Sequence, residues 1–406
     1  MKVDQLRVDY DARTLTPVEL VPRFRAQGYA PADVAHRRLW VEQKTGVRLT
    51  HIAACSIPTE HMRGNVENAI GTVQTPLGVA GPLRINGTHA NGTFYVPLAT
   101  TEGALVRSHE RGMVTLTRAG GVTARITVDE NRVCPAFLLE SVDAASRFVD
   151  ELPVHVGSLR AEADATTRHG RLLRIEPRQI GREVIVTFSY ATGDAHGMNM
   201  IVKATERACD WLAERTGASY QIFSGFSSEK RASASLLSSG KGKCVVAGAR
   251  IPAAVSRACL HATPRQLVHV WQHAVVGHLL AGAFGCSAQF ANGLTALFIA
   301  CGQDVANVAN AHVGITSFEL TPDDDLYAAV TLPSLSVATV GGGTALGTSH
   351  ECLAMLGCAG TGGARRFAEI AAATVLAGEV SMAAAIASGD IVRAHEQYGR
   401  NRPAAE

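Results

Sequence analysis

The stretch that decides the fold is residues 183–216, EVIVTFSYATGDAHGMNMIVKATERACDWLAERT. It opens on a run in which Val184, Val186 and Phe188 fall on one face, the alternation typical of a strand. The turn TGDAHG follows, and residues 198–216 have the pattern of an amphipathic helix. Charged residues also become more frequent from about residue 127. The sequence therefore predicts a separate α+β unit, ending near Phe223, inserted into the rest of the chain.

The sequence before this unit predicts a hairpin and a helix. Residues 83–96, LRINGTHANGTFYV, contain the strong turn dipeptide Asn-Gly twice and predict two antiparallel strands. Next, Thr100 and Thr101 predict the cap of a helix over residues 102–116.

The two ends of the chain differ in composition and in hydrophobic pattern. Residues 1–60 are polar and predict an N-terminal helical segment, with the clearest pattern around Pro31–Lys44. Everything after about residue 223 is rich in Ala and Gly and predicts helices, apart from the loop PSLSVATVGGGTALG at 333–347.

The composition excludes several classes of protein. The chain has 406 residues, 47% hydrophobic and 18% charged, with a net charge of +2, and these values exclude a disordered chain. The near-zero charge balance, the lack of a basic run and the 5% aromatic content argue against nucleic-acid binding. The nine cysteines form no C-x-x-C pair, which predicts reduced thiols in the cytosol.

We expect a cytoplasmic protein without membrane contact. The first 15 residues, MKVDQLRVDYDARTL, are charged throughout and lack the apolar core of a signal peptide. Residues 274–303, part of the longest uncharged stretch, carry His278, Gln289 and Asn292 among Gly and Ala. These polar residues predict a buried helix pair rather than a membrane span.

Generic catalytic motifs leave the function open. The sequence contains no G-x-G-x-x-G, P-loop, G-x-S-x-G or H-E-x-x-H motif. His269, His273 and His278 share one predicted helix, but no carboxylate or cysteine is close to them in sequence. Core or surface histidines are therefore favoured over a metal site, and no metal is predicted.

Four ionisable residues lie in sequence settings that do not favour a solvated surface position: Glu102, Lys230, Asp304 and His395. Each also has an ordinary structural explanation. Glu102 suits the dipole of a helix start, and Asp304 suits a salt-bridged helix end. Lys230 is one of six lysines and suits a loop, while His395 suits a polar tail.

Seven strings, in order and in register, resemble the hydroxymethylglutaryl-CoA reductase family in its soluble, class I-like bacterial form. The resemblance covers about four-fifths of the chain, from residue 67 to residue 395. The strings are ENAIGTVQTPLGVAGPL (67–83), VPLATTEGALV (96–106), TGDAHGMNM (192–200), GKGKCVVAGARIPA (240–253), IACGQD (299–304), LPSLSVATVGGGT (332–344) and AGEVSMAAAIASGDIVRAH (377–395).

The resemblance implies an α+β fold. A large α/β substrate domain with a long central helix would carry an inserted ferredoxin-like small cofactor domain, so no Rossmann fingerprint is needed. Together with the change of texture, this divides the chain into an N-terminal helical segment (1–60), a large catalytic domain binding CoA and substrate (61–126 and 223–406) and a small NADP(H)-binding domain (127–222).

The implied reaction reduces 3-hydroxy-3-methylglutaryl-CoA to mevalonate and CoA with two NADPH, through a mevaldyl-CoA hemithioacetal and mevaldehyde. The family's catalytic positions fall on Glu102, Lys230, Asp304 and His395. The Lys230 ammonium would stabilise the oxyanion, a contribution of about 3–4 kcal/mol for one preorganised donor. His395 would protonate the departing thiolate, and a protonated Glu102 would serve the second reduction.

The charge of Glu102 is pulled in two directions. A helix N-terminus favours its carboxylate, whereas a second carboxylate close by, Asp304, favours the protonated acid. We favour a cluster in which Lys230 bridges the two carboxylates and the three groups titrate together.

The family's acyl-binding positions fall on Arg125, Ser224, Glu229, Arg231 and Asn292. The Arg125 guanidinium suits a bidentate clamp on a carboxylate. The loop SGFSSEKR (224–231) is one residue shorter than is usual and has Glu where Asp is expected. In addition, Gln289 stands where a histidine is common. These departures surround the acyl group, so the reaction type is better determined than the acyl substrate.

Two segments are implied to bind the cofactor. DAHGMN (194–199) has a histidine where methionine is usual, and residues 167–168 align with a Ser-Arg pair that holds the 2′-phosphate. A hydroxyl beside an arginine suits a phosphate dianion, so NADPH is expected and NADH is less favoured. The residues concerned are Thr167, Arg168, Asp194, His196, Gly197, Met198 and Asn199.

The implied assembly is a homodimer or a dimer of dimers, with active sites at the subunit interface. The small-residue helices expected at 274–301 and 366–390 suit close-packed dimer surfaces. Two other interpretations stay open. In the first, the chain is a family member that acts on another acyl thioester in secondary metabolism, or that acts in mevalonate oxidation. In the second, it is a catalytically dead paralogue. Retention of all four catalytic side chains argues against the last.

Overall fold

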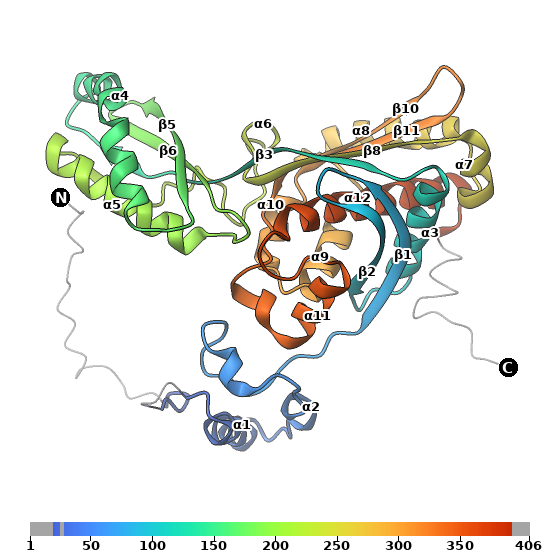
Figure 1. Ribbon diagram of the computed structural model, residues 1–406, viewed down its shortest axis with the longest axis horizontal. Helices are drawn as coiled ribbons and strands as arrows, with labels where there is room; N and C mark the ends of the chain where they lie inside the picture. The colour runs from blue at the N-terminus through green and yellow to red at the C-terminus, as the bar shows by residue number, and fades with distance from the viewer. Residues whose placement is uncertain (1–18, 25–27, 392–406) are drawn as a thin grey trace.

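The computed structural model describes residues 19–24 and 28–391. Its N-terminal part is helical, as expected, and lies beside the main body in Figure 1. Helix α1 (Pro31–Thr45) begins on a proline and ends at Gly46, whose positive φ of 71° allows its N–H to cap the Glu42 carbonyl. The short elements α2 (Thr50–Ala53) and η2 (Thr59–Met62) follow.

The predicted hairpin is confirmed, whereas the helix after it begins later than expected. Strands β1 (Leu77–Asn86) and β2 (Asn91–Ala99) pair antiparallel around the expected turn. Helix α3 runs from Leu105 to Arg118 and not from Glu102, because Ala104 adopts a left-handed φ of 71°. Thr100 does accept a backbone N–H, that of Glu102, but within a turn that precedes the helix.

A single nine-stranded sheet runs through both halves of the chain, in the order β7-β4-β6-β3-β8-β11-β10-β9 with β5 paired to β6. Strand β3 (Thr123–Val133) is long enough to pair with β8 over its first part and with β6 over its end. Figure 1 shows it passing from one half of the molecule to the other.

The expectation of helices throughout the region after residue 223 is wrong. Strands β8 (Gly242–Ile251), β10 (Gly314–Leu320) and β11 (Leu326–Leu335) lie there and form the middle of the sheet with β9 (Gly285–Cys286). The Ala, Gly and Val residues of β8 and β11 do not alternate with polar ones. A buried strand of this kind cannot be distinguished from a buried helix by periodicity.

Residues 136–221 form a β-α-β-β-α-β unit with its own hydrophobic cluster. Its strands lie in the order β7-β4-β6-β5, the ferredoxin-like arrangement. The strand at Glu183–Ala191 and the helix at Met198–Thr216 are confirmed. The elements are β4 (Ala136–Leu138), α4 (Val142–Asp164), β5 (Arg171–Ile180), β6 (Glu183–Ala191), α5 (Met198–Thr216) and β7 (Ser219–Gln221).

The long helix α12 (Ala364–Ser388) passes through the centre of the larger half, as Figure 1 shows. By length and composition it could cross a membrane, but most of it is buried in the core of the molecule. Its contact with α3 is close, because a Cβ on Gly112 would meet the Ala377 carbonyl oxygen. This central helix and the mixed α+β architecture agree with expectation. The remaining helices are α6 (Leu236–Ser239), α7 (Ala253–Leu260), α8 (Pro264–Leu280), α9 (Phe290–Ala300), η3 (Val305–Asn307), α10 (Val308–Ala311), η4 (Gly342–Ala345) and α11 (Gly347–Met355).

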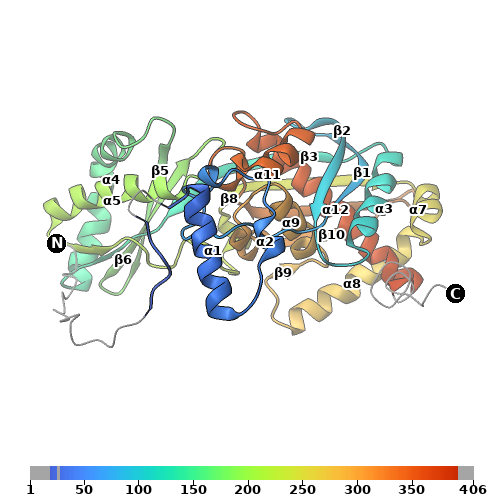
Figure 2. The ribbon, with the colours of Figure 1, turned by 90° about the horizontal axis from the view of Figure 1, so that it is seen from below.

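The uncharged stretch 274–303 is only half buried. Helix α9 lies in the core, but the end of α8 exposes Val276, Leu279 and Leu280 to solvent. In Figure 2, α8 runs along the edge of the molecule while α9 lies inside it. The expected buried helix pair is therefore wrong for α8, which presents an apolar surface instead.

Candidate active site

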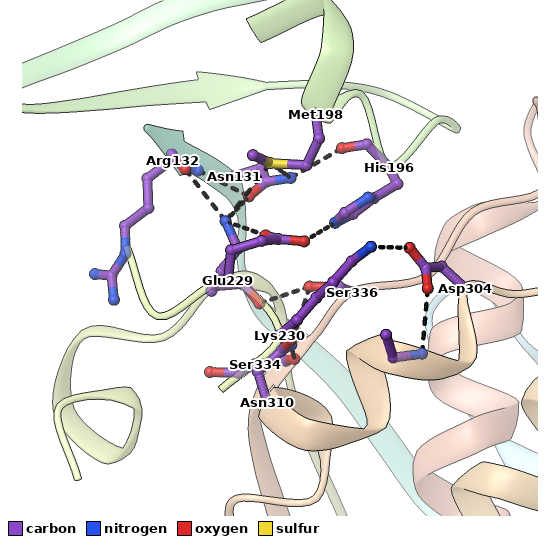
Figure 3. A network of polar contacts seen from close by, with 12 residues as sticks. Asn131, Arg132, His196, Met198, Glu229, Lys230, Asp304, Asn310, Ser334 and Ser336 are labelled. Carbon is purple, nitrogen blue, oxygen red and sulfur yellow. Dashed lines mark hydrogen bonds and ion pairs between the residues drawn. The ribbon is translucent and has the colours of Figure 1, made fainter. Parts of the chain in front are cut away.

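The loop after β7 brings Lys230 to Asp304. The Lys230 ammonium lies 2.7 Å from Asp304 Oδ2, and both side chains are about half exposed. Asp304 is fixed at the start of η3, where its other oxygen accepts the Ala306 N–H. Lys230 has a left-handed φ of 53°, as does Ser228 at 55°, so the loop is tightly turned here. Figure 3 shows this pair at the edge of a larger polar network.

Glu102 is held by a different partner. The amide of Asn292, on α9, donates a 2.9 Å hydrogen bond to Glu102 Oε2. Among the ion pairs of residues 28–391, Lys230 contacts Asp304 and not Glu102. The expected bridge of Lys230 between two carboxylates is therefore not formed within this single chain.

The start of α9 is fixed by a buried carboxylate, Glu379 of α12. Its oxygens accept the N–H groups of Ala288 and Gln289 and the hydroxyl of Thr316. Burial raises the pKa of Glu379, since those hydrogen bonds compensate only in part for lost hydration. Gln289, the position where a histidine was expected, thus begins the helix that presents Asn292.

Glu229 points away from Lys230 and into the protein. Its carboxylate lies 2.8 Å from the ammonium of Lys241, whose side chain is completely buried. Lys241 also donates to Asn131 Oδ1 at 2.7 Å and to the Arg132 carbonyl at 3.2 Å. Burial lowers the pKa of Lys241, although Glu229 opposes that shift. Figure 3 shows the Glu229 carboxylate directed to the His196 ring and the Lys230 ammonium directed to Asp304.

The same network reaches the DAHGMN turn. Asn131 donates to the His196 carbonyl at 2.9 Å, and the His196 ring lies 3.9 Å from the Glu229 carboxylate. Burial lowers the pKa of His196, and Glu229 raises it to a smaller extent. Lys241, which the sequence analysis missed, thus connects the catalytic loop to the expected cofactor turn.

The expected cofactor turn lies at the start of a helix. Gly197 caps α5 with a left-handed φ of 76°, and a Cβ there would meet Thr192 at 2.8 Å. Met198 and the exposed Asn199 form the first turn of α5, where backbone N–H groups are free to meet an anion.

The segment 167–170 lies next to this helix start. A Cβ added at Gly170 would lie 3.0 Å from the Met200 methyl group, and a Cβ added at Gly197 would lie 3.2 Å from the same group. The Thr167 hydroxyl accepts the N–H groups of His169 and Gly170. Arg168 follows it and is exposed. The two segments expected to hold the cofactor are therefore neighbours in space.

Asp194 makes a different contribution. Its carboxylate accepts the N–H groups of Gly362 and Ala364 at the start of α12, and its carbonyl accepts those of Thr339 and Val340. These four hydrogen bonds occupy the oxygens of Asp194 and hold the expected cofactor turn against α12 and the 339–340 segment.

The residues expected at the acyl group are dispersed. Arg125 donates to the carbonyls of Asn86 and Ala124, on the part of β3 that pairs with β8, so the structure does not bring it to Lys230. Ser224 donates to the Cys134 carbonyl at 2.6 Å, and Arg231 turns back to the Glu229 carbonyl. The last expected catalytic residue, His395, lies outside the described residues.

Comparison with known proteins identifies the family. The model of the hydroxymethylglutaryl-coenzyme A reductase family matches residues 33–400. The chain is 43% identical to the 3-hydroxy-3-methylglutaryl-coenzyme A reductase of Methanothermobacter thermautotrophicus, over 93% of this chain and 96% of that protein. The chain belongs to this reductase family. The reductase of Methanocaldococcus jannaschii is 41% identical, over 90% of this chain and 92% of that protein.

Solved structures of reductases share the fold. A class II 3-hydroxy-3-methylglutaryl-CoA reductase from Streptococcus pneumoniae, solved with bound NADPH, superposes with a TM-score of 0.67 at 19% identity. The match covers 87% of this chain and 96% of that one. The narrower expectation of a class I-like bacterial reductase is not supported, since these sequence relatives are archaeal and the structural match is class II.

Proposed function

We propose that the chain reduces 3-hydroxy-3-methylglutaryl-CoA to mevalonate and CoA with two NADPH. The observation that carries this proposal is the Lys230–Asp304 pair, in which an ammonium is held 2.7 Å from a carboxylate while half exposed to solvent. Hydride addition to a thioester carbonyl places negative charge on oxygen, and a positioned ammonium is the donor that this charge requires. Family membership supports the choice of substrate class.

The residues at the start of α5 fit a dinucleotide phosphate. Gly197 lets backbone approach closely, the N-terminus of α5 favours an anion, and Arg168 lies on the neighbouring segment. We therefore keep Thr167, Arg168, Gly197, Met198 and Asn199 as cofactor residues and assign NADPH over NADH. Asp194 and His196 shape the turn. We also propose that residues 127–222 act as the cofactor domain.

The side chains of the protein then have separate roles in the reaction. When bound, the reduced nicotinamide supplies the hydride in each reduction. Asp304 holds the Lys230 ammonium in position for the oxyanion, and Asn292 orients the carboxyl group of Glu102 as a proton donor for the second reduction. We assign protonation of the leaving thiolate to His395.

The CoA portion of the substrate has a suitable cavity. A cavity of about 570 Å³ is lined by Glu102, by Arg107, Arg111 and Arg118 of α3, and by His261, together with the acidic Glu110 and Asp390. Several guanidinium groups along one wall suit the phosphates of CoA, and the size suits a ligand of this class.

A retuned acyl specificity is the second candidate function. Ser224 and Glu229 are committed to Cys134 and Lys241, and Arg125 lies elsewhere. Three of the five residues expected to bind the acyl carboxylate are therefore engaged within the protein. This observation favours another acyl thioester, with the same hydride chemistry.

We further propose a homodimer with shared active sites in the cytoplasm. The exposed end of α8, with Val276, Leu279 and Leu280, supports a dimer surface there, as does exposed Phe284 just beyond it. We do not assign the segment 366–390 to the dimer surface, because most residues of α12 are buried within the chain.

NADPH oxidation with a panel of acyl-CoA thioesters tests the function. We expect the highest kcat/KM with 3-hydroxy-3-methylglutaryl-CoA, with two NADPH consumed per mevalonate formed. A higher kcat/KM with another acyl-CoA would establish the second candidate function instead. No turnover with any thioester would overturn both.

His395→Gln tests the division of roles. Thioester reduction must expel a thiolate, whereas reduction of free mevaldehyde expels nothing. We expect the overall reaction to slow by about 10²–10⁴, the range for loss of a general acid, with mevaldehyde turnover within a few-fold of wild type. An equal loss in both assays would contradict the proton-donor role.

A further inference from the structure

Helix α8, at the edge of the molecule in Figure 2, carries two histidines whose ring nitrogens lie side by side. The Nε2 atoms of His269 and His273 are 3.0 Å apart. Their ring centroids are 4.3 Å apart and the ring planes cross at 87°. Both residues are exposed to solvent. The spacing of four residues places them on one face of the helix, and the structure adds that the two nitrogens are close neighbours.

The rest of α8 fixes the direction in which this pair points. Leu267 is fully buried, and Trp271 donates its indole N–H to the Thr316 carbonyl of β10 at 2.7 Å. Leu267 and Trp271 are two positions away from the histidines along the chain, so they lie on the opposite, inward face of the helix. The backbone beneath the pair is therefore already held, and a ligand of the two rings has little to order when it binds.

The separation of the two nitrogens matches that of neighbouring ligands on one metal ion. Imidazole nitrogens bind metal ions at about 2.0–2.1 Å, so nitrogens 3.0 Å apart subtend an angle of about 90–100° at a shared ion. This angle is typical of square-planar and octahedral sites. Chelation requires both Nε2 atoms to be without hydrogen. Because the rings are exposed, the hydrogen of each can move to Nδ1, where water accepts it.

The surroundings of the pair leave room for a hydrated cation. Arg265, one turn before His269, is paired with Asp324 at 3.2 Å, so its positive charge is offset. Within residues 19–24 and 28–391, no third His, Cys, Asp or Glu is placed to complete a three-residue metal site. The chain therefore supplies two nitrogen ligands, and water supplies the remaining ones.

We propose that His269 and His273 form a two-histidine surface site for a transition-metal dication of the Ni²⁺ or Cu²⁺ class. Imidazole ligands suit these ions, and so does the angle of about 90–100°. Mg²⁺ and Ca²⁺, which take oxygen ligands, are excluded. Neither histidine lines the cavity assigned to CoA, so the inference does not rest on the reductase activity.

Calorimetric titration with Ni²⁺ tests the site, on a protein without a polyhistidine tag and in a buffer that does not bind metals. We expect one strongest site per wild-type chain. His269→Gln and His273→Gln should each weaken it at least about tenfold, because a single imidazole loses the advantage of two linked ligands. His278→Gln is the matched control on the same helix, since Nδ1 of His278 already contacts the Ala274 carbonyl, and it should bind Ni²⁺ like wild type.

The electron paramagnetic resonance spectrum of bound Cu²⁺ gives a second readout, which reports the ligands directly. At less than one Cu²⁺ per chain, the wild-type spectrum should show coupling to two imidazole nitrogens, and each single variant should lose that pattern. The proposal is overturned if wild type does not bind Ni²⁺, if His269→Gln or His273→Gln binds it like wild type, or if His278→Gln weakens binding as much as they do. Displacement of Ni²⁺ by an excess of Mg²⁺ would also overturn the assigned class of ion.

Discussion

Two ion pairs formed by neighbouring residues, Glu229 and Lys230, lie in opposite environments. Lys230 reaches outward to Asp304, and both side chains are about half exposed. Glu229 reaches inward to Lys241, whose side chain has no exposure at all. The distances are nearly equal, 2.7 and 2.8 Å, so geometry alone does not distinguish them.

The difference in burial decides what each pair does. Solvent screens the outer pair, which contributes at most about 1 kcal/mol to stability and leaves its ammonium available to a developing oxyanion. The inner pair has lost its hydration, so each charge depends on the other. It holds the loop, β3 and the cofactor turn together. One pair is therefore suited to chemistry and the other to positioning.

Lys241→Met should have the largest effect on stability. It leaves the Glu229 carboxylate buried without its partner, and we expect the free energy of unfolding to fall by about 3–5 kcal/mol, measured by urea titration. The double variant Glu229→Met with Lys241→Met should recover most of that loss. If the single variant is as stable as wild type, the inner pair is not the positioning element.

Lys230→Met should show the reverse pattern. We expect kcat to fall by about 10²–10³, the cost of one oxyanion donor, because the ammonium is lost from the reacting centre. The free energy of unfolding should change by less than about 1 kcal/mol, since the pair is solvent-screened. A large loss of stability would remove the contrast between the two pairs.

Arg168→Ala extends the comparison to an exposed cation that a ligand is expected to cover. It should raise the KM for NADPH about ten- to a hundred-fold and leave that for NADH nearly unchanged, because only NADPH carries the 2′-phosphate. Arg147→Ala, an exposed arginine on α4, is the matched control and should change neither KM. A wild-type preference for NADH would show that Arg168 does not meet a phosphate.

The smallest effect concerns the pH dependence near the inner pair. Burial lowers the pKa of His196, so below about pH 6.5 the unfolded chain binds a proton that the folded one does not. Stability is therefore lost as pH falls through that value. Between pH 7.0 and 5.5 we expect His196→Met to lose up to about 1 kcal/mol less than wild type. Equal losses would show that His196 protonates freely in the folded state.

Local sequence patterns were sufficient for several elements. The Asn-Gly turns placed the β1–β2 hairpin, and the strand–turn–helix pattern at 183–216 placed β6 and α5. Local patterns were insufficient for β8 and β11, whose Ala, Gly and Val residues do not alternate with polar ones. The start of α3 was displaced because the left-handed residue that precedes it is an alanine, not a glycine.

Only some residues of the candidate site could be predicted from the sequence. Lys230 and Asp304 were singled out from their residue types and settings, and they meet in the structure. Arg125 was chosen for its position after two glycines and lies elsewhere. Lys241 was one of only six lysines and stands in a quoted motif, yet no pattern marked it as buried. The scarcity of lysine in this chain is the one sequence feature that points to Lys241.

By itself, the sequence determined the turn chemistry, the amphipathic helices and the presence of the reacting groups, because these depend on residues within a few positions of one another. Only the tertiary structure decided which charge is buried. Glu229 and Lys230 are adjacent, and left-handed backbone at Ser228 and Lys230 accompanies their opposite directions. Their partners, Asp304 and Lys241, come from distant segments, and hydration at each partner is set by the packing of the whole chain.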